Sequence, residues 1–175
     1  MPVWNIDSDH SVAAFIVKHM MITDVHGQFN SIKGTVRFDP SDITGTSIEL
    51  EIDAAGIFTG IKKRDDHLKS REFFDVGKYP VITFRSAKCE ITAFNGCKVT
   101  GDLTIHGITK PLTAEVEFLG PVKSPFAETS MGFAAKTVIN NEDFGLIWNM
   151  PLENGGLMIG RDVHVFMDIE ADLAE

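Results

Sequence analysis

The sequence predicts an all-β protein, and three observations lead to this prediction. Apolar and polar residues alternate with a period of two over several stretches, such as 47–53, as they do in half-buried antiparallel strands. Turn-forming pairs such as Asn95-Gly96 separate these stretches, and no long helices alternate with them. Only the segment 59–71 competes as a helix. About eight strands joined in this way indicate a sandwich or an up-and-down barrel, and the sequential hairpins favour the barrel.

The expected elements fit one domain that spans residues 1–175. The predicted strands are 11–17, 33–38, 47–53, 81–87, 99–105, 112–118, 131–135 and 163–173. Within 99–105, Gly101 marks a bulge or a close approach of two backbones. A second short turn of helix is expected at 18–22.

The alternation also assigns the side chains that each strand turns inward. A slip of one residue would carry Glu49, Glu51 and Glu117 into the interior, so we expect these three glutamates to face water. The inward residues are then Ile48, Leu50, Ile52, Leu103, Ile105, Val116, Phe118, Met131 and Phe133.

The helix-capable segment 59–71 is polar and begins at Thr59, which we expect to cap it. Its few apolar residues are too sparse for a core helix, but they suit a cover over an apolar opening. The side chains expected to face inward beneath this cover are Leu68, Phe73 and Phe74, and Arg64 is expected near the entrance.

Charge and hydropathy exclude several classes of partner. The net charge of −9 opposes a nucleic-acid footprint and attraction to anionic lipid surfaces. No run of about 18 apolar residues occurs, so we expect no stable membrane insertion. Residues 1–7 lack the basic and apolar regions of a signal peptide, which predicts a cytoplasmic protein.

The two cysteines, Cys89 and Cys97, flank Asn95-Gly96, a strong hairpin signal. With these two residues as the loop, Phe94 pairs with Cys97 and Cys89 pairs with Asp102. The cysteines then lie roughly 17 Å apart, beyond the reach of a disulfide. We therefore predict two free thiols and a reducing compartment.

The polar motifs give weak signals for catalysis or metal binding. Asp7, His10 and Ser11 are the residue types of a catalytic triad, but neighbouring side chains of a strand point to opposite faces, which favours a local capping role. No Gly-x-Ser-x-Gly elbow occurs. The six histidines show no metal-ligand spacing, so we expect neither a metal nor a cofactor, although a site assembled from distant strands stays open.

The apolar composition leaves the interior open to two interpretations. The 13 phenylalanines and 7 methionines can fill a small barrel or line a ligand cavity within it. In the apolar stretch 144–153, Trp148, Met150 and Leu152 share one face if the chain is extended. This stretch is either a bent strand of the wall or an edge that meets a partner or closes a pocket.

Taken in order, a set of short motifs resembles the YceI-like family of lipid-binding proteins over nearly the whole chain. The motifs are Trp4-x-x-Asp7-x-x-His10-Ser11, Phe15-x-Val17-Lys18-His19, Gly27-x-Phe29, Arg64-Asp65-x-His67-Leu68-x-Ser70-x-x-Phe73-Phe74-Asp75, Tyr79-Pro80-x-Ile82-x-Phe84, Gly101-x-Leu103-Thr104-Ile105-x-Gly107-x-Thr109-Lys110, Asp143-Phe144-Gly145 and Trp148-Asn149-x-x-Leu152-Glu153-x-Gly155-Gly156. Asn141 and His106 depart from the pattern, since arginine is common at both positions. These departures bear on the head group that the protein prefers.

The resemblance implies an extended, eight-stranded, lipocalin-like antiparallel barrel with one short covering helix. It also implies non-catalytic binding, storage or transport of a long-chain amphipathic lipid of the isoprenoid, polyprenyl pyrophosphate, quinone or fatty-acyl type. Many relatives look periplasmic, and the absence of a leader points to a cytoplasmic branch. The resemblance and the stretch around Trp148 together predict a homodimer.

We expect the ligand to contact apolar side chains along the barrel and its cover. These residues are Phe15, His19, Ile48, Leu50, Arg64, Leu68, Phe73, Phe74, Phe84, Leu103, Phe118, Phe133 and Trp148. Two alternatives remain: an enzyme that acts on a hydrophobic small molecule with His19 or His67 as acid or base, and a structural dimerising module with a filled core.

Overall fold

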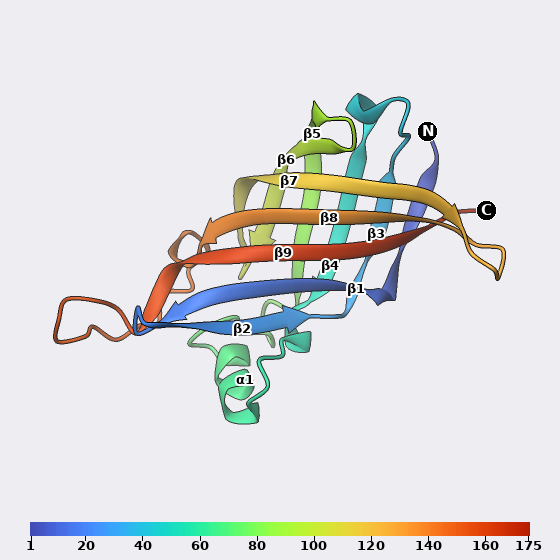
Figure 1. The fold of residues 1–175 in the computed structure, drawn as a ribbon. Helices are drawn as coiled ribbons and strands as arrows, with labels where there is room; N and C mark the ends of the chain where they lie inside the picture. The colour runs from blue at the N-terminus through green and yellow to red at the C-terminus, as the bar shows by residue number, and fades with distance from the viewer.

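The computed structural model describes residues 1–175 as one antiparallel sheet that closes on itself (Figure 1). The strands are β1 (Val3–His19), β2 (Thr23–Phe29), β3 (Ile32–Arg37), β4 (Ser47–Asp53), β5 (Val81–Ala93), β6 (Gly96–Ile105), β7 (Ile108–Lys123), β8 (Thr129–Asn140) and β9 (Ile159–Leu173). The α-helix is α1 (Lys62–Lys69), and η1 (Ile43–Gly45), η2 (Ala54–Gly56) and η3 (Asn141–Phe144) are short 3-10 helices. No helix is long and apolar enough to cross a membrane.

The long strand β1 closes the barrel. One of its edges pairs with β9, while its other edge pairs first with β3 and then, beyond Ala13, with β2. Only Asn30 and Ser31 separate β2 from β3, so these two strands occupy one position of the barrel in succession. The predicted eight-stranded barrel is thereby confirmed against the sandwich.

At one end the barrel splits into two walls. β4 pairs with β3 but not with β2, and β7 pairs with β8 only from Glu115 onward. Figure 1 shows β8, β9, β1 and β2 running side by side across the direction of β3 to β6. The chain around α1 covers the first gap, where Gln28 and Phe58 exchange two backbone hydrogen bonds of 2.9 Å. At the second gap, Thr137 Oγ1 donates to the carbonyl oxygen of Thr113.

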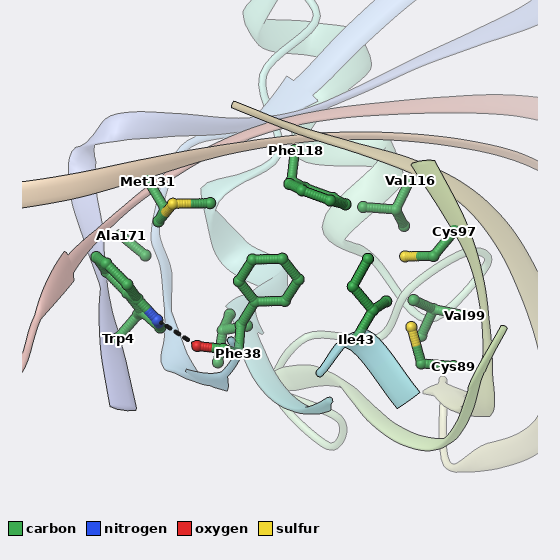
Figure 2. Close-up of a cluster of buried hydrophobic side chains, with 11 residues drawn as sticks. Trp4, Phe38, Ile43, Cys89, Cys97, Val99, Val116, Phe118, Met131 and Ala171 are labelled. Carbon is green, nitrogen blue, oxygen red and sulfur yellow. Dashed lines mark hydrogen bonds between the residues drawn. The ribbon is translucent and has the colours of Figure 1, made fainter. Parts of the chain in front are cut away.

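Aromatic side chains fill the opposite end (Figure 2). The ring of Phe38 is 1% exposed, and its centroid lies 4.8 Å from that of Phe118 and 5.3 Å from that of Phe133. Trp4 packs in the same cluster and donates from Nε1 to the Phe38 carbonyl oxygen at 2.9 Å. Because the rings of Phe38, Phe118 and Phe133 pack against one another among other buried apolar side chains, this end of the barrel is closed.

The predicted inward face is confirmed along the strands. Ile48, Leu50 and Ile52 point inside, and Phe118 and Met131 are buried at the closed end. On the outside, Glu49 pairs with Arg85 and Glu51 pairs with Lys33, and Glu117 is exposed. Gly101 is a close approach as expected, since a Cβ atom there would lie 2.3 Å from the Arg85 carbonyl oxygen.

Cys89 and Cys97 are free, buried thiols, but the register that predicted a wide separation is wrong. The turn falls on Phe94 and Asn95 rather than on Asn95-Gly96, and register shifts follow in β5. Cys89 therefore pairs with Val99, and Cys97 lies only two residues before Val99 on β6. Figure 2 shows the two sulfur atoms in one cluster. A hydrogen bond between the two thiols lowers the pKa of Cys89 and raises that of Cys97.

Two local predictions are also wrong. The helix α1 begins at Lys62, and its N-cap residue is Ile61, whose side chain has no polar atom to cap it. Thr59 is not the cap, and its hydroxyl donates to Asp65. The chain at 18–22 is not helical: β1 continues to His19 and a tight turn follows. The strands β1 and β5 are longer than expected, and β2 was not predicted.

We predict that Phe38→Ala lowers the free energy of unfolding by about 3–5 kcal/mol, since it opens a cavity between buried rings. Phe94→Ala is the matched control, because Phe94 is 100% exposed and its removal should change stability by less than about 0.5 kcal/mol. Urea unfolding of both variants measures the difference. Equal losses would show that the Phe38 cluster does not hold the closed end together.

Candidate functional site: an apolar cavity between the two walls

Between the two walls lies a cavity of about 460 Å³. Its lining is hydrophobic at 33 of 42 residues, so the space suits an extended apolar ligand rather than a polar metabolite. The walls leave it unfilled because the strands diverge where their hydrogen bonding stops.

The structure brings nearly all of the predicted site residues to this cavity. The residues on its surface are Phe15, His19, Ile48, Leu50, Arg64, Leu68, Phe73, Phe74, Phe84, Leu103, Phe133 and Trp148. Phe118 is the exception, since it points inward but is buried against Phe38 at the closed end. Parity along a strand gives the face of a side chain but not its depth in the barrel.

The strand β9 and much of β1 and β8 also line the cavity, although the predicted site did not include them. The additional lining residues there are Ala13, Ala14, Val17, Ala135, Thr137, Ile139, Val163, Val165, Met167 and Ile169. The alternation of 163–173 indicated which side chains of β9 could face inward, although the predicted site contained none of them.

Three aromatic side chains, from β1, from β2 and from the chain that follows α1, form part of the cavity wall. The centroid of Phe29 lies 5.9 Å from that of Phe15 and 5.9 Å from that of Phe74. Phe15 sits directly over Gly27, where a Cβ atom would come within 2.1 Å of the Phe15 Cζ atom. Glycine at this position therefore lets the ring lie against β2 instead of projecting into the cavity.

Two segments cover the open end of the barrel: α1 with the residues that follow it up to Phe74, and the chain between η3 and β9. We call these two segments the lid. The ring centroid of Trp148 lies 4.8 Å from that of His67 and 5.4 Å from that of Phe73. Trp148 belongs to the segment between η3 and β9, and His67 belongs to α1, where Glu72 binds its Nε2 atom. The segment around Trp148 is not a strand of the wall, so of the two interpretations the structure supports a flap that closes a pocket.

Arg64 holds the lid to the chain that precedes it. Its Nε atom donates to Thr59 Oγ1 at 2.7 Å, and its Nη2 atom donates to the Thr59 carbonyl oxygen at 2.7 Å. The buried carboxylate of Asp65 accepts a hydrogen bond from the Thr59 backbone N–H at 2.9 Å. Arg64 also lines the cavity, and these bonds use only part of its guanidinium group.

The ionisable residues on the cavity surface are all basic. They are Lys18, His19, Arg64, His67 and Lys136, and no carboxylate lines the cavity, although the protein carries a net charge of −9. Lys18 and Lys136 pair with Asp24 and Glu115 on the outer side. This distribution favours an anionic or neutral ligand over a cationic one.

The two departures from the family pattern have different surroundings. Asn141 is buried on the cavity surface, and its Nδ2 atom donates to the Gly160 carbonyl oxygen at 3.0 Å. His106 lies outside the cavity lining, next to the Tyr79 ring and the Phe144 carbonyl oxygen. Any effect on head-group preference therefore falls to Asn141.

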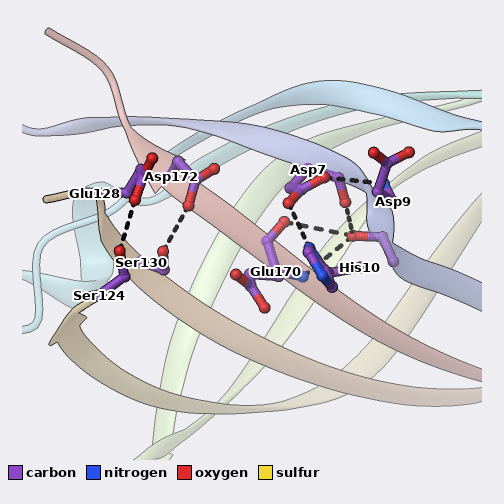
Figure 3. A network of polar contacts seen from close by, with 9 residues as sticks. Asp7, Asp9, His10, Ser124, Glu128, Ser130, Glu170 and Asp172 are labelled. Atoms are coloured by element: carbon purple, nitrogen blue, oxygen red, sulfur yellow. Dashed lines mark hydrogen bonds and ion pairs between the residues drawn. The ribbon is translucent and has the colours of Figure 1, made fainter. Parts of the chain in front are cut away.

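The residues Asp7, His10 and Ser11 form a surface network around a register shift in β1 rather than a catalytic triad (Figure 3). His10 Nδ1 lies 2.6 Å from Asp7 Oδ2. Ser11 Oγ donates to the Asp7 carbonyl oxygen and accepts from the Glu170 backbone N–H, so it makes no bond to His10. The predicted capping role is confirmed. Glu170 joins the network from β9, a distant contact that spacing along the sequence could not indicate.

We predict that His10 titrates above its ordinary pKa of 6.5, because its hydrogen bond to the Asp7 carboxylate favours the charged ring. The same bond lowers the pKa of Asp7 below 3.8. The contribution of His10 to stability is therefore lost as pH rises through its folded-state pKa, and that of Asp7 is lost as pH falls through its own. NMR titration of the His10 ring measures this pKa, and in the variant Asp7→Asn the pKa of His10 should return towards 6.5. An unchanged pKa in that variant would contradict the assignment.

Fold and cavity together define a class of protein: a closed antiparallel barrel with a hollow apolar interior and a lid. The YceI-like domain family matches residues 4–171, and the chain belongs to this family.

Relatives and solved structures agree with this assignment. A UPF0312 protein of Staphylococcus aureus strain N315 is 35% identical over 176 residues, which cover 100% of both chains. A UPF0312 protein of Pseudomonas savastanoi pv. phaseolicola is 35% identical over 80% of this chain and 73% of its own. The YCEI protein of Campylobacter jejuni superposes with a TM-score of 0.77 at 28% identity, over 90% of each chain.

Two more distant structures show the fold alone. Burkholderia cenocepacia BcnA superposes with a TM-score of 0.83 at 23% identity, over 94% of this chain and 98% of its own. A polyisoprenoid binding domain from Saccharophagus degradans, implicated in plant cell wall breakdown, gives a TM-score of 0.70 at 16% identity, over 99% of this chain and 100% of its own.

Proposed function

We propose that this protein binds and carries one long-chain amphipathic lipid, with the tail inside the barrel and the head group at the lid. The observation that carries the proposal is the apolar cavity of about 460 Å³ between the walls. Each methylene group removed from water contributes about 0.8 kcal/mol, so ten or more outweigh any single polar contact at the mouth.

An isoprenoid is the tail that we favour. The support is the common fold with a domain described as polyisoprenoid binding, together with a lining of branched and aromatic side chains. For the head group, the basic residues at the cavity favour a phosphate or pyrophosphate over a neutral quinone.

Native mass spectrometry and organic extraction of the purified protein test this proposal directly. We expect one prenyl lipid for each chain. The proposal would be contradicted if the extract contained no lipid and the purified protein also failed to bind prenyl lipids added in excess. A lipid recovered in chemically altered form after incubation would instead favour an enzyme that uses His19 or His67.

We predict that Leu50→Trp weakens lipid binding by about tenfold or more, since the indole fills space that several methylene groups of the tail would occupy. Glu49→Trp is the matched control, because it adds the same ring one residue away on the outer face. Fluorescence titration with a prenyl phosphate compares the two variants. If both bind like the parent protein, the tail does not lie along β4.

We predict that Arg64→Met weakens binding of a prenyl pyrophosphate by about 1.5–3 kcal/mol, the scale of a charge-assisted hydrogen bond. It should also lower the melting temperature, because Arg64 donates two hydrogen bonds to Thr59.

The control is Thr59→Val, which removes the hydroxyl that Arg64 binds but keeps the guanidinium group. It should lower the melting temperature with little loss of affinity. Calorimetry with a prenyl pyrophosphate and with the matching alcohol separates the roles: equal losses for both ligands in Arg64→Met would leave Arg64 with a structural role only.

A homodimer in the cytoplasm is a further part of the proposal. Within the apolar stretch on which the predicted dimer contact rested, Trp148 packs against His67 and Phe73, while its neighbours Ile147 and Met150 are exposed. Support for the dimer therefore comes from the family resemblance alone, and light scattering at micromolar concentration tests it.

A further inference from the structure

An exposed apolar surface lies at the open end of the barrel, and we call it the tip. It consists of Met20, Met21 and Ile22 from the β1–β2 turn and of Ile147 and Met150 from the segment before β9. Their exposed fractions are 39%, 46%, 80%, 71% and 51%. Figure 1 shows the loop before β9 projecting beyond the strands at the left, with the β1–β2 turn at its base.

Backbone contacts join the two segments of the tip into one surface. The Met20 N–H donates to the Met158 carbonyl oxygen at 2.7 Å, and the Met158 N–H donates to the Met150 carbonyl oxygen at 2.9 Å. The backbones of the turn and the loop are therefore held together through Met158.

The two methionines of the β1–β2 turn have a backbone conformation that is unfavourable for methionine. Met20 and Met21 have φ values of 52° and 63°, and the Ile22 N–H closes the turn on the His19 carbonyl oxygen at 3.1 Å. Turns with two positive φ values favour Asn-Gly, since other side chains are strained there. The Met21 side chain lies over Gly156 and Gly160, yet 39% of Met20 and 46% of Met21 stay exposed, so contacts within this chain use only part of the two side chains.

The tip is also almost free of charge. Residues 20–23 carry no charged side chain, and the segment 145–158 carries only Glu153, in a chain that is 23% charged. The tip continues into the cavity, whose lining includes Lys18, His19, Trp148 and Met158. An uncharged apolar surface thus leads to the mouth of an apolar cavity.

We propose that the tip inserts into the surface of a lipid bilayer, so that lipid passes between the bilayer and the cavity without crossing water. This inference rests on the proposed function, since it names the surface from which the ligand comes. A projecting tip of five side chains suits a soft bilayer, whereas a stable protein interface needs about 20–30 residues on each side. Flexible thioether side chains adapt readily to such a surface.

Flotation with phosphatidylcholine vesicles tests the proposal. The parent protein should float with the vesicles, and high salt should leave this binding unchanged, because the contact is apolar. Phosphatidylglycerol-rich vesicles should bind less protein, since the net charge is −9.

The decisive variant combines Met20→Asn with Met21→Gly. Asn and Gly suit the two positive φ values, which offsets the contacts that Met21 loses with Gly156 and Gly160, so the melting temperature should stay close to that of the parent protein. The vesicle affinity should fall by about tenfold or more. Phe126→Ser is the matched control, because Phe126 is 84% exposed in the β7–β8 turn at the far end of the barrel, and it should float like the parent protein.

Unchanged flotation of the double variant, or equal loss in Phe126→Ser, would overturn the proposal. A double variant that loses self-association instead of vesicle binding would assign the tip to a second copy of the chain. Native mass spectrometry of the parent protein keeps the two ideas apart: a bound lipid with no flotation refutes the docking surface alone, and flotation with a cavity that binds no lipid refutes the proposed function.

Discussion

The arrangement of this barrel depends on the contact of Phe38 with Trp4, Phe118 and Phe133. An antiparallel barrel of eight positions has room either for its own side chains or for a guest. At this end no space is left for a ligand, because the Phe38 ring packs against Phe118 and Phe133. The backbone carbonyl oxygen of Phe38 also accepts a hydrogen bond from Trp4. The cavity can therefore open in only one direction, and the lid, the basic side chains and the apolar tip all belong to that end.

The hollow end follows from where backbone pairing stops. Strands that diverge leave edges whose N–H and C=O groups need other partners. Here Phe58 satisfies the edge of β2, and the Thr137 hydroxyl reaches the backbone of β7. The segments that complete the wall are thus held by few hydrogen bonds, and such regions open at low free energy. A lid built in this way can admit a long chain while the paired strands remain intact.

Much of this fold follows from local pattern. Alternation along 47–53 and 112–118 placed the correct residues inside, because a slip of one residue would bury glutamates. The depth of Phe118, however, depends on how far each strand runs along the barrel axis, which no local pattern records. The strand β2 escaped prediction because Thr23–Phe29 is polar and short, and its partner β1 supplies most of the reason for its conformation.

The errors at Cys89 and Thr59 have the same origin. The displaced turn moves Cys89 by two residues relative to its expected partner, and the register shift between Ile91 and Ala93 adds one more, so that Val99 takes the place of Asp102. Thr59 looked like a helix cap, yet its hydroxyl serves Arg64 and Asp65, two residues whose side chains meet only once α1 has formed. At Cys89 and at Thr59, the local sequence allows more than one hydrogen-bond partner, and the tertiary structure determines which partner is used.

The cavity also has a thermodynamic consequence. The core in the hollow half of the barrel surrounds a cavity, so a bound lipid tail would add buried apolar contacts to that core. A ligand at 100 times its dissociation constant adds about 2.7 kcal/mol to the free energy of unfolding, a large share of the total for a domain of this size. The loaded protein would then outlast the empty one against proteases, and the amount that persists in the cell would follow the supply of its cargo.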